Sequence, residues 1–200
     1  MGREWVAESG RDLAFSFLFR ADTPLEWTPS LAMATAVGVA EAMEAQGLTV
    51  KLKWPNDIFA SGGKIAGILT ECLTGESGLV MVVGIGVNVN MRRETAEKIT
   101  PPATSYFLET GQEQDTDRFL DIILGRLPRW LEEWEDGGFG KIRPAWEKLA
   151  ANPGEKIIAR HHGRARSGTL AGYGEFGELL LLQADGEITR VWSGDIETEM

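Results

Sequence analysis

Residues 53–71, with the sequence KWPNDIFASGGKIAGILTE, combine a polar turn, two adjacent glycines and the start of an apolar strand. Pro55, Asn56 and Asp57 form the turn after a strand-like run, and Lys64 stands where the next apolar run begins. A lysine ammonium is a compact charge with three donors, so it can contact a carboxylate and a phosphate oxygen together. The neighbouring glycines remove side chains that would keep a ligand away from the backbone. These residues alone support a ligand-binding lysine and a surface lysine beside a hairpin about equally.

A second stretch with features of a ligand site is VVGIGVNVN at residues 82–90. Gly84 and Gly86 interrupt a strand of the buried type, and glycines inside a strand often mark the close approach of a ligand or another backbone. Asn88 follows them, and its side-chain amide could pair a donor and an acceptor with the edge of a purine. A bulged strand that ends in turn-forming asparagines explains the same residues, and this stretch by itself favours that simpler interpretation.

The chain begins with MGREW, which adds two candidate residues. Arg3 could neutralise a phosphate, and Trp5 could cover a base. Terminal residues are often poorly ordered unless another element holds them. Composition alone therefore favours a frayed terminus, and these two candidates depend on what the rest of the chain indicates.

The residues around these stretches predict an α+β protein. Apolar residues alternate over residues 12–20, which is typical of a strand. Thr28 and Pro29 are expected to supply a helix N-cap and a first-turn proline, and a helix rich in small residues follows up to Gly47. Further strands are expected over 48–53, 64–73 and 79–88, and helices over 117–134 and 139–150, the first of them interrupted at Pro128.

The sequence Asn152-Pro153-Gly154 is the clearest boundary in the chain, because it combines three turn-forming residues. After it, short strand-like segments are separated by glycine turns, as in a small β-barrel of the SH3-like kind. We therefore expect two domains, a larger one at residues 1–151 and an SH3-like one at residues 152–200.

Composition limits the partners and the location of the protein. The 200 residues carry a formal net charge of −10, and phosphate backbones require a basic face, so nucleic acid is not expected as a partner. The single cysteine, Cys72, allows no internal disulfide, and its apolar surroundings predict a buried position. No run is long and apolar enough for a membrane span, and the first residues lack the pattern of a signal peptide. These features lead us to expect a cytoplasmic protein with no membrane contact.

Three of these stretches, taken together and in order, resemble the central motifs of the biotin protein ligase family. They are KWPND at residues 53–57, GKIAGILTE at 63–71 and GIGVNVN at 84–90. ATS at residues 103–105 is similar to the next motif, and the segment from residue 152 is similar to the family's C-terminal domain, so the resemblance covers essentially the whole chain. It implies a mixed β-sheet flanked by helices, the class II synthetase-like fold of biotin and lipoate ligases, followed by an SH3-like β-barrel.

The resemblance also implies a reaction in two steps. Such a ligase uses ATP and Mg2+ to form biotinyl-5′-AMP, and then transfers biotin to a lysine of a biotin carboxyl carrier protein. Lys64 and Asp57 correspond to catalytic residues. Lys64 would contact the biotin carboxylate and the α-phosphate, and Asp57 would bind Mg2+ or position Lys64. A fixed ammonium between two anions would offset their repulsion and the charge that develops during transfer.

The same resemblance implies a set of residues that bind biotin and the adenylate. Trp5 would cover the adenylate, Arg3 would lie near its phosphates, and Asn88 would read the adenine. The whole set comprises Arg3, Trp5, Lys53, Asn56, Lys64, Gly67, Gly84, Gly86 and Asn88. The implied partners are biotin, ATP and the carrier domain of a carboxylase. The resemblance also allows a homodimer, because some family members dimerise through an exposed sheet edge.

The start of the chain differs from the family pattern. Members usually begin the catalytic domain further upstream, with a stretch that binds the biotin ureido ring, so residues 1–151 are expected to be an N-terminally truncated catalytic domain. Two alternatives to an active biotin ligase therefore stay open. The first is a catalytically impaired fragment or a non-enzymatic module that binds adenylate or the carrier, and pyrophosphate release with biotin and ATP would test it. The second is a lipoate-type acyl ligase, which would accept lipoate in place of biotin.

Overall fold

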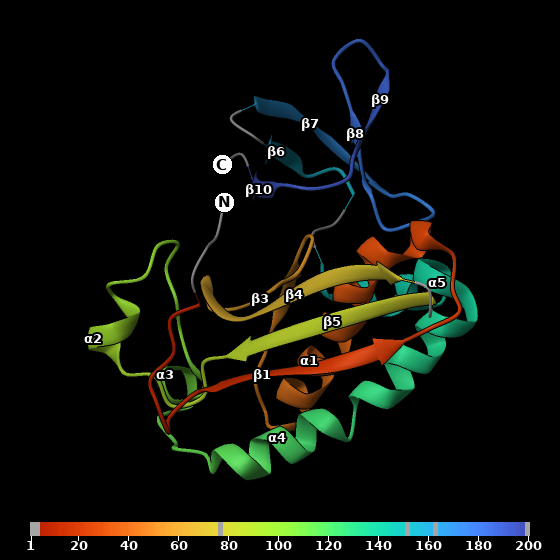
Figure 1. The fold of residues 1–200 in the computed structure, drawn as a ribbon. Coiled ribbons are helices and arrows are strands. Elements are labelled where there is room, and N and C mark those ends of the chain that lie inside the picture. The colour runs from red at the N-terminus through yellow and green to blue at the C-terminus, as the bar shows by residue number, and fades with distance from the viewer. Residues whose placement is uncertain (1–4, 76–77, 151–152, 162–163, 199–200) are drawn as a thin grey trace.

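The computed structural model describes residues 5–75, 78–150, 153–161 and 164–198. It contains two β-sheets and a layer of helices (Figure 1). The first sheet has the strand order β1-β5-β4-β3-β2, and the second has the order β10-β6-β7-β8-β9. The chain is therefore an α+β protein, as the sequence predicts.

The first sheet forms from the N-terminal half of the chain. Its strands are β1 (Leu13–Arg20), β2 (Lys51–Lys53), β3 (Asp57–Ala60), β4 (Gly63–Gly75) and β5 (Gly78–Val87). All neighbouring strands pair antiparallel. The expected mixed sheet is therefore wrong, because the one parallel contact among the described residues is an isolated bridge between Lys64 and Ala103. The sequence pattern also misses β3, because a strand of four residues is too short to show a periodicity.

Helices cover one face of the first sheet and leave its other face open (Figure 1). The described helices are η1 (Leu25–Ser30), α1 (Leu31–Ala45), α2 (Arg93–Ala96), α3 (Tyr106–Thr110), α4 (Thr116–Leu124) and α5 (Leu127–Leu149), and α1 makes most of the contacts with the sheet. α1 is buried along almost its whole length between the sheet and α5, which its small residues allow. A Cβ added at Gly38 would lie 3.1 Å from Cδ2 of Leu127, so the two helices approach each other closely.

The helix boundaries follow the sequence prediction only in part. Thr28 and Pro29 lie inside η1, and Ser30 is the N-cap of α1, because the preceding residues already form a 3-10 helix that runs into α1. The interruption expected at Pro128 is confirmed, since α5 begins one residue before this proline. The separate helix expected over 139–150 is also confirmed, since Gly137 and Gly138 have non-helical backbone angles (φ +58 at Gly138) and divide α5 into two helical segments at a kink.

The second sheet contains the short strands expected after residue 152. They are β6 (Lys156–His161), β7 (Arg164–Tyr173), β8 (Leu179–Leu182), β9 (Ile188–Val191) and β10 (Asp195–Thr198). All neighbouring strands pair antiparallel. β9 and β10 stand at the two edges, so the pairs among the described residues form an open sheet and do not close a barrel.

The loop between β7 and β8 attaches the second sheet to the rest of the chain. Arg143 of α5 donates from its two terminal nitrogens to the carbonyl oxygens of Tyr173 (2.5 Å) and Gly174 (2.7 Å). Trp54 donates from Nε1 to the carbonyl oxygen of Gly177 at 2.9 Å, in a buried hydrogen bond. Burial raises the pKa of the Tyr173 hydroxyl to about 12, while the contact with Arg143 is made by the backbone carbonyl of this residue. The loop therefore touches the KWPND turn, to which Trp54 belongs.

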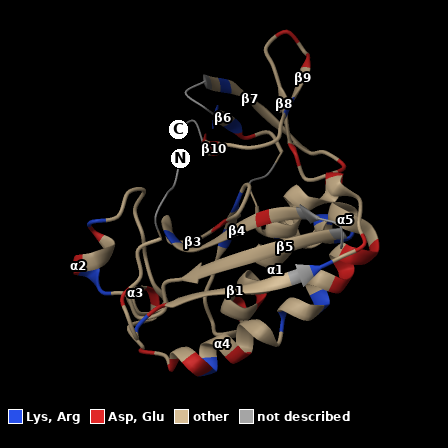
Figure 2. Cartoon of the chain, in the orientation of Figure 1, with Lys and Arg blue, Asp and Glu red and all other residues tan. Residues whose placement is uncertain are grey.

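The surface is acidic, as the net charge predicts, but the predicted burial of Cys72 is wrong. Acidic side chains are spread over α4 and α5 (Figure 2). Cys72 is exposed and not buried, because the last part of β4 around it, residues 71–73, is exposed as a whole. None of the described helices has the length and apolar character that crossing a membrane requires.

Removal of the Arg143 contact should cause a measurable loss of stability. Arg143→Met keeps an apolar stem of similar length and removes both donors from two backbone carbonyls. We expect the free energy of unfolding to fall by about 1.5–3 kcal/mol, the range for hydrogen bonds to charged groups. Denaturant unfolding of the variant and the parent protein measures this difference.

Arg129→Met is the matched control, because Arg129 is exposed and its ion pair with Glu41 spans 3.7 Å. Exposed pairs of this kind contribute at most about 1 kcal/mol. Equal losses in the two variants would show that the Arg143 contact does not hold the β7–β8 loop.

Candidate functional site

The strand register places four of the expected site residues in one row across the first sheet. Lys53 pairs with Asp57, Asp57 with Gly67, Gly67 with Gly86, and Gly86 with Ala14. Directly paired residues point to the same face of a sheet. Lys53, Asp57 and the two glycines therefore lie side by side on the face that the helices leave open.

A β-bulge brings Lys64 to this same face. The register between β3 and β4 shifts between Ile58 and Phe59, which leaves Ile65 as an extra residue on β4. Lys64 stands three positions before Gly67, so in a regular strand the two would point to opposite faces. The extra residue reverses this, and Ile65 itself is completely buried. Bulges commonly re-aim a side chain beside an active site in this way.

The ammonium of Lys64 lies above the row of paired residues. Its Nζ is 2.6 Å from Oδ1 of Asp57, and the two side chains are 24% and 15% exposed. A Cβ added at Gly67 would lie 3.0 Å from both Cε and Nζ of Lys64, so glycine at this position leaves the path for the lysine stem. Because the pair is partly withdrawn from water, its attraction exceeds that of a fully solvated pair. The open face thus presents a positioned positive charge.

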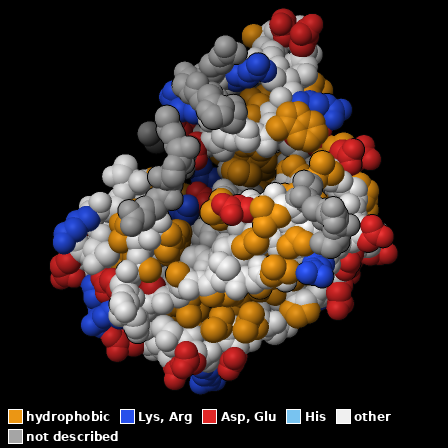
Figure 3. Space-filling model, in the orientation of Figure 1, with side chains coloured by type: hydrophobic (Ala, Val, Ile, Leu, Met, Phe, Trp, Pro, Cys, Tyr) orange, Lys and Arg blue, Asp and Glu red, His pale blue; other side chains and the backbone are white. Residues whose placement is uncertain are grey.

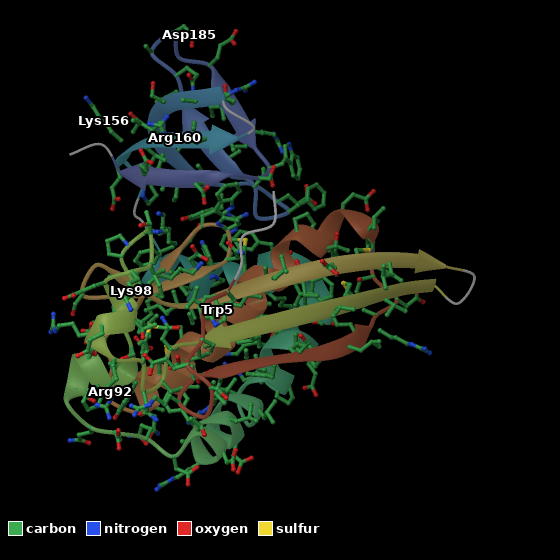
Figure 4. All side chains as sticks on the ribbon, turned by 60° about the vertical axis from the view of Figure 1, so that its left-hand side comes forward. Trp5, Arg92, Lys98, Lys156, Arg160 and Asp185 are labelled. Carbon is green, nitrogen blue, oxygen red and sulfur yellow. The ribbon has the colours of Figure 1, made fainter. Side chains whose placement is uncertain are left out.

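Trp5 covers the patch formed by Gly67 and Gly86, which we call the glycine platform. A Cβ added at Gly86 would overlap the indole ring, and one added at Gly67 would lie 3.2 Å from it. Figure 4 shows Trp5 against β4 and β5, and the Nζ of Lys64 lies 5.6 Å from the ring centroid. The indole Nε1 is buried and has no hydrogen-bond partner among the described residues. The glycine platform is therefore shaped to accept a flat ring.

Two asparagines hold the backbone around Lys64. The side chain of Asn56 donates to the carbonyl oxygen of Ile68, and the Ile68 N–H donates back to Asn56 O at 3.0 Å. Nδ2 of Asn88 donates to Thr104 O at 2.9 Å and to Lys64 O at 3.3 Å. Its backbone N–H donates to the carbonyl of the bulged residue at 2.9 Å. Oδ1 of Asn88 is buried without a partner among the described residues.

The other expected residues occupy less central positions. Gly84 lies on the open face beyond the platform, and a Cβ there would meet no atom nearer than 3.5 Å, the Oγ of Ser16. Nζ of Lys53 lies over the ring of Phe59, 5.2 Å from its centroid. Arg3 lies outside the described residues, so its expected place near phosphates stays a prediction.

The open face carries features that the sequence analysis misses. Leu18, Leu69 and Leu73 are 61%, 62% and 59% exposed, and hydrophobic side chains gather on this face (Figure 3). An alternating pattern identifies strands that have two faces, but it does not tell which face a helix covers. Thr104 lies beside Lys64, since its N–H donates to Lys64 O at 3.0 Å, and the ATS motif was the signal in the sequence that pointed to it. Glu109, which accepts a hydrogen bond from the Thr104 hydroxyl, lies outside that motif.

The site offers little to a resident metal ion. No group of three or more His, Cys, Asp or Glu residues that could hold one occurs in the described part of the chain. Asp57 is the one carboxylate in the row across the sheet. Mg2+ is usually held by one or two carboxylates together with substrate phosphates. The residues therefore fit an ion that enters with a nucleotide.

Comparison with known sequences gives the family context. Residues 1–88 match the model of the biotin/lipoate A/B protein ligase family. The biotin–acetyl-CoA-carboxylase ligase of Paracoccus denitrificans is 36% identical over 190 residues, which cover 90% of this chain and 77% of that protein. The bifunctional ligase/repressor BirA of Bacillus spizizenii is 33% identical over 200 residues, which cover 98% of this chain. The chain spans 61% of the length of that Bacillus relative.

A solved structure shares the architecture. The biotin protein ligase of Aquifex aeolicus in complex with biotin and ATP superimposes with a TM-score of 0.81 at 30% sequence identity. The match covers 99% of this chain and 82% of that structure. The paired glycines, the bulge and the lysine thus belong to a chain that agrees with the family in sequence and in fold. Because the family model, the sequence identity and the fold agree, the chain belongs to the biotin/lipoate A/B protein ligase family.

Proposed function

We propose that this chain is an ATP-dependent biotin protein ligase, which forms biotinyl-5′-AMP and transfers biotin to a lysine of a biotin carboxyl carrier protein. The observation that carries the proposal is the Lys64–Asp57 pair, held at 2.6 Å above the glycine platform by a β-bulge. The names of the relatives and the bound biotin and ATP of the Aquifex aeolicus ligase support this choice of substrates.

The first step joins two anions. A carboxylate oxygen of biotin attacks the α-phosphorus of ATP, the bond from this phosphorus to the bridging oxygen of the β-phosphate breaks, and pyrophosphate leaves. Lys64 would contact both the carboxylate and the α-phosphate, which lowers their repulsion, and Asp57 would fix the direction of the ammonium. Mg2+ would arrive with ATP and offset phosphate charge, with Asp57 as the carboxylate available to it.

The second step releases AMP. The neutral amine of the carrier lysine attacks the acyl carbon, an amide bond forms, the bond to the phosphate oxygen of AMP breaks, and the amine loses a proton. The glycine platform would receive the adenylate, with Trp5 stacked on the ligand instead of on the glycines and Arg3 near the phosphate. Asn88 would accept a hydrogen bond from the adenine amino group through Oδ1. Lys53, Asn56 and Gly84 would border the ligand.

The proposal includes the domain organisation and the partners. Residues 1–151 would act as the catalytic domain, and residues 152–200 would fold as a separate domain of the SH3-like kind. The carrier domain of a carboxylase is the macromolecular partner, and nucleic acid has no role. A cytoplasmic location and a homodimer through an exposed sheet edge complete the proposal.

The substrate itself can be tested by binding. Calorimetry of this chain with biotin, with and without Mg–ATP, is expected to show binding that ATP strengthens, and lipoic acid should bind at least about tenfold more weakly, which corresponds to about 1.4 kcal/mol. Equal affinity for lipoic acid would favour a lipoate-type ligase. Absence of biotin binding would favour an impaired fragment or a non-enzymatic module.

Substitution of Lys64 tests the proposed chemistry. Lys64→Ala should lower the rate of pyrophosphate release with biotin and Mg–ATP by at least about 100-fold, because one preorganised charge stabilises the transition state by several kcal/mol. The melting temperature should change little, since the lysine side chain lies on the open face. Lys98→Ala removes an exposed lysine elsewhere and is the control, and unchanged turnover in Lys64→Ala would refute the assignment.

The glycine platform gives a graded prediction. Gly86→Ala puts a methyl group where the indole of Trp5 now lies, so we expect affinity for biotin and for the adenylate to fall by about tenfold or more. Gly84→Ala places its methyl group at ordinary van der Waals distances, 3.5 Å or more from its neighbours, and should cause a smaller loss. Calorimetry on both variants measures the two affinities, and the reverse order of losses would contradict binding on the platform.

A further inference from the structure

The backbone of Lys64 has a neighbour outside the regular sheet. β5 ends at Val87, and residues 102–104 lie where its continuation would pair with β4. The Lys64 N–H donates to Pro102 O at 2.9 Å, and the Thr104 N–H donates to Lys64 O at 3.0 Å. These two bonds form the isolated parallel bridge between Lys64 and Ala103. The placement of the lysine therefore depends on a loop segment that comes from elsewhere in the chain.

Glu109 of α3 binds this segment and the turn that precedes Lys64. Its Oε1 accepts a hydrogen bond from Oγ1 of Thr104 at 2.5 Å, and its Oε2 accepts one from Oγ of Ser61 at 2.6 Å. Ser61 lies in the tight turn between β3 and β4 and has a φ of +46. A single carboxylate thus connects the turn before the lysine with the segment beside it. We call these three side chains the Glu109 clamp.

The packing around the clamp leaves little freedom. Thr104 is 7% exposed, and a Cβ added at Gly63 would lie 2.9 Å from its Cβ. The carbonyl of Thr104 also accepts from Nδ2 of Asn88. A displacement of Thr104 would therefore be transmitted to the backbone of Lys64 through the two bonds of the bridge, and from there to the ammonium above the glycine platform.

We propose that Glu109 is a positioning residue of this site, which acts through Thr104 and Ser61 to hold the backbone of Lys64 so that its ammonium stays beside Asp57. Both carboxylate oxygens of Glu109 are engaged by hydroxyl groups, so the residue needs no contact with substrate. The consequence for catalysis rests on the proposed ligase function. The holding of the Lys64 backbone rests on the geometry alone.

Kinetics of adenylate formation test the catalytic consequence. Thr104→Val removes one hydroxyl with almost no change of shape, and Glu109→Ala removes the acceptor of both hydroxyls. In each variant, kcat for pyrophosphate release should fall about tenfold to 100-fold, because small misplacements of a catalytic group have effects of this size. KM for biotin and for ATP should stay within about twofold, since binding contacts are retained.

Three comparisons separate positioning from a general structural effect. Thr104→Ser keeps the hydroxyl and should restore most of kcat. Thr110→Val removes another hydroxyl of α3, which donates to Tyr106 O, and should leave kcat near that of the parent protein. The double variant Thr104→Val with Glu109→Ala should have a kcat no lower than that of the slower single variant, because both changes remove the same interaction. Additive losses, an unchanged kcat or a loss confined to KM would overturn the inference.

Amide hydrogen exchange gives a measurement that needs no activity. In Thr104→Val and Glu109→Ala, the amides of Lys64 and Thr104 should exchange faster, while those in the central part of the β4–β5 pair should not change. If the parent chain releases no pyrophosphate, the proposed ligase function fails. The exchange pattern then tests by itself whether the Glu109 clamp holds the backbone of Lys64. Unchanged exchange at Lys64 and Thr104 in both variants would overturn the inference in either case.

Discussion

The extra residue in β4 is the constraint on which the site depends. Side chains alternate strictly along a regular strand, so Lys64 and Gly67 could not share a face without an insertion between them. The bulge at Ile65 supplies it and brings the ammonium to within 2.6 Å of Asp57. A bulge also interrupts the hydrogen-bond ladder of the sheet. The carbonyl groups released at this point therefore need other donors, and much of the surrounding structure supplies them.

Those donors come from parts of the chain that are far apart in the sequence. Asn88 provides its backbone N–H and its side-chain amide, and Thr104 provides a backbone N–H in place of the strand that ends at Val87. From the opposite side, the KWPND turn is held by Asn56 and, through Trp54, by a carbonyl of the β7–β8 loop. The lysine is thus positioned by contacts between distant segments, while the glycine platform beside it leaves room for a ligand.

Most elements of the fold can be predicted from the chain because their patterns are local. The alternation of β1, the small residues of α1 and the glycine turns of the second sheet each lie within a few neighbouring residues. The pairing of β1 with β5 and the exposure of Cys72 could not be predicted in this way. Both depend on which distant strands pair and on how far the helices extend over them, and no local pattern records either.

The sequence by itself determined which residues could carry the chemistry: a lysine and an aspartate near each other, glycines in two strands, and the order of the motifs. Only the tertiary structure decided that these residues meet, because the pairs Asp57–Gly67 and Gly67–Gly86 depend on strand register. It also decided that Asn88 uses its amide nitrogen to hold the backbone, while its Oδ1 has no partner among the described residues. The physical reason is that a motif specifies residue types along one segment, whereas the position of a charge is set by hydrogen bonds between segments.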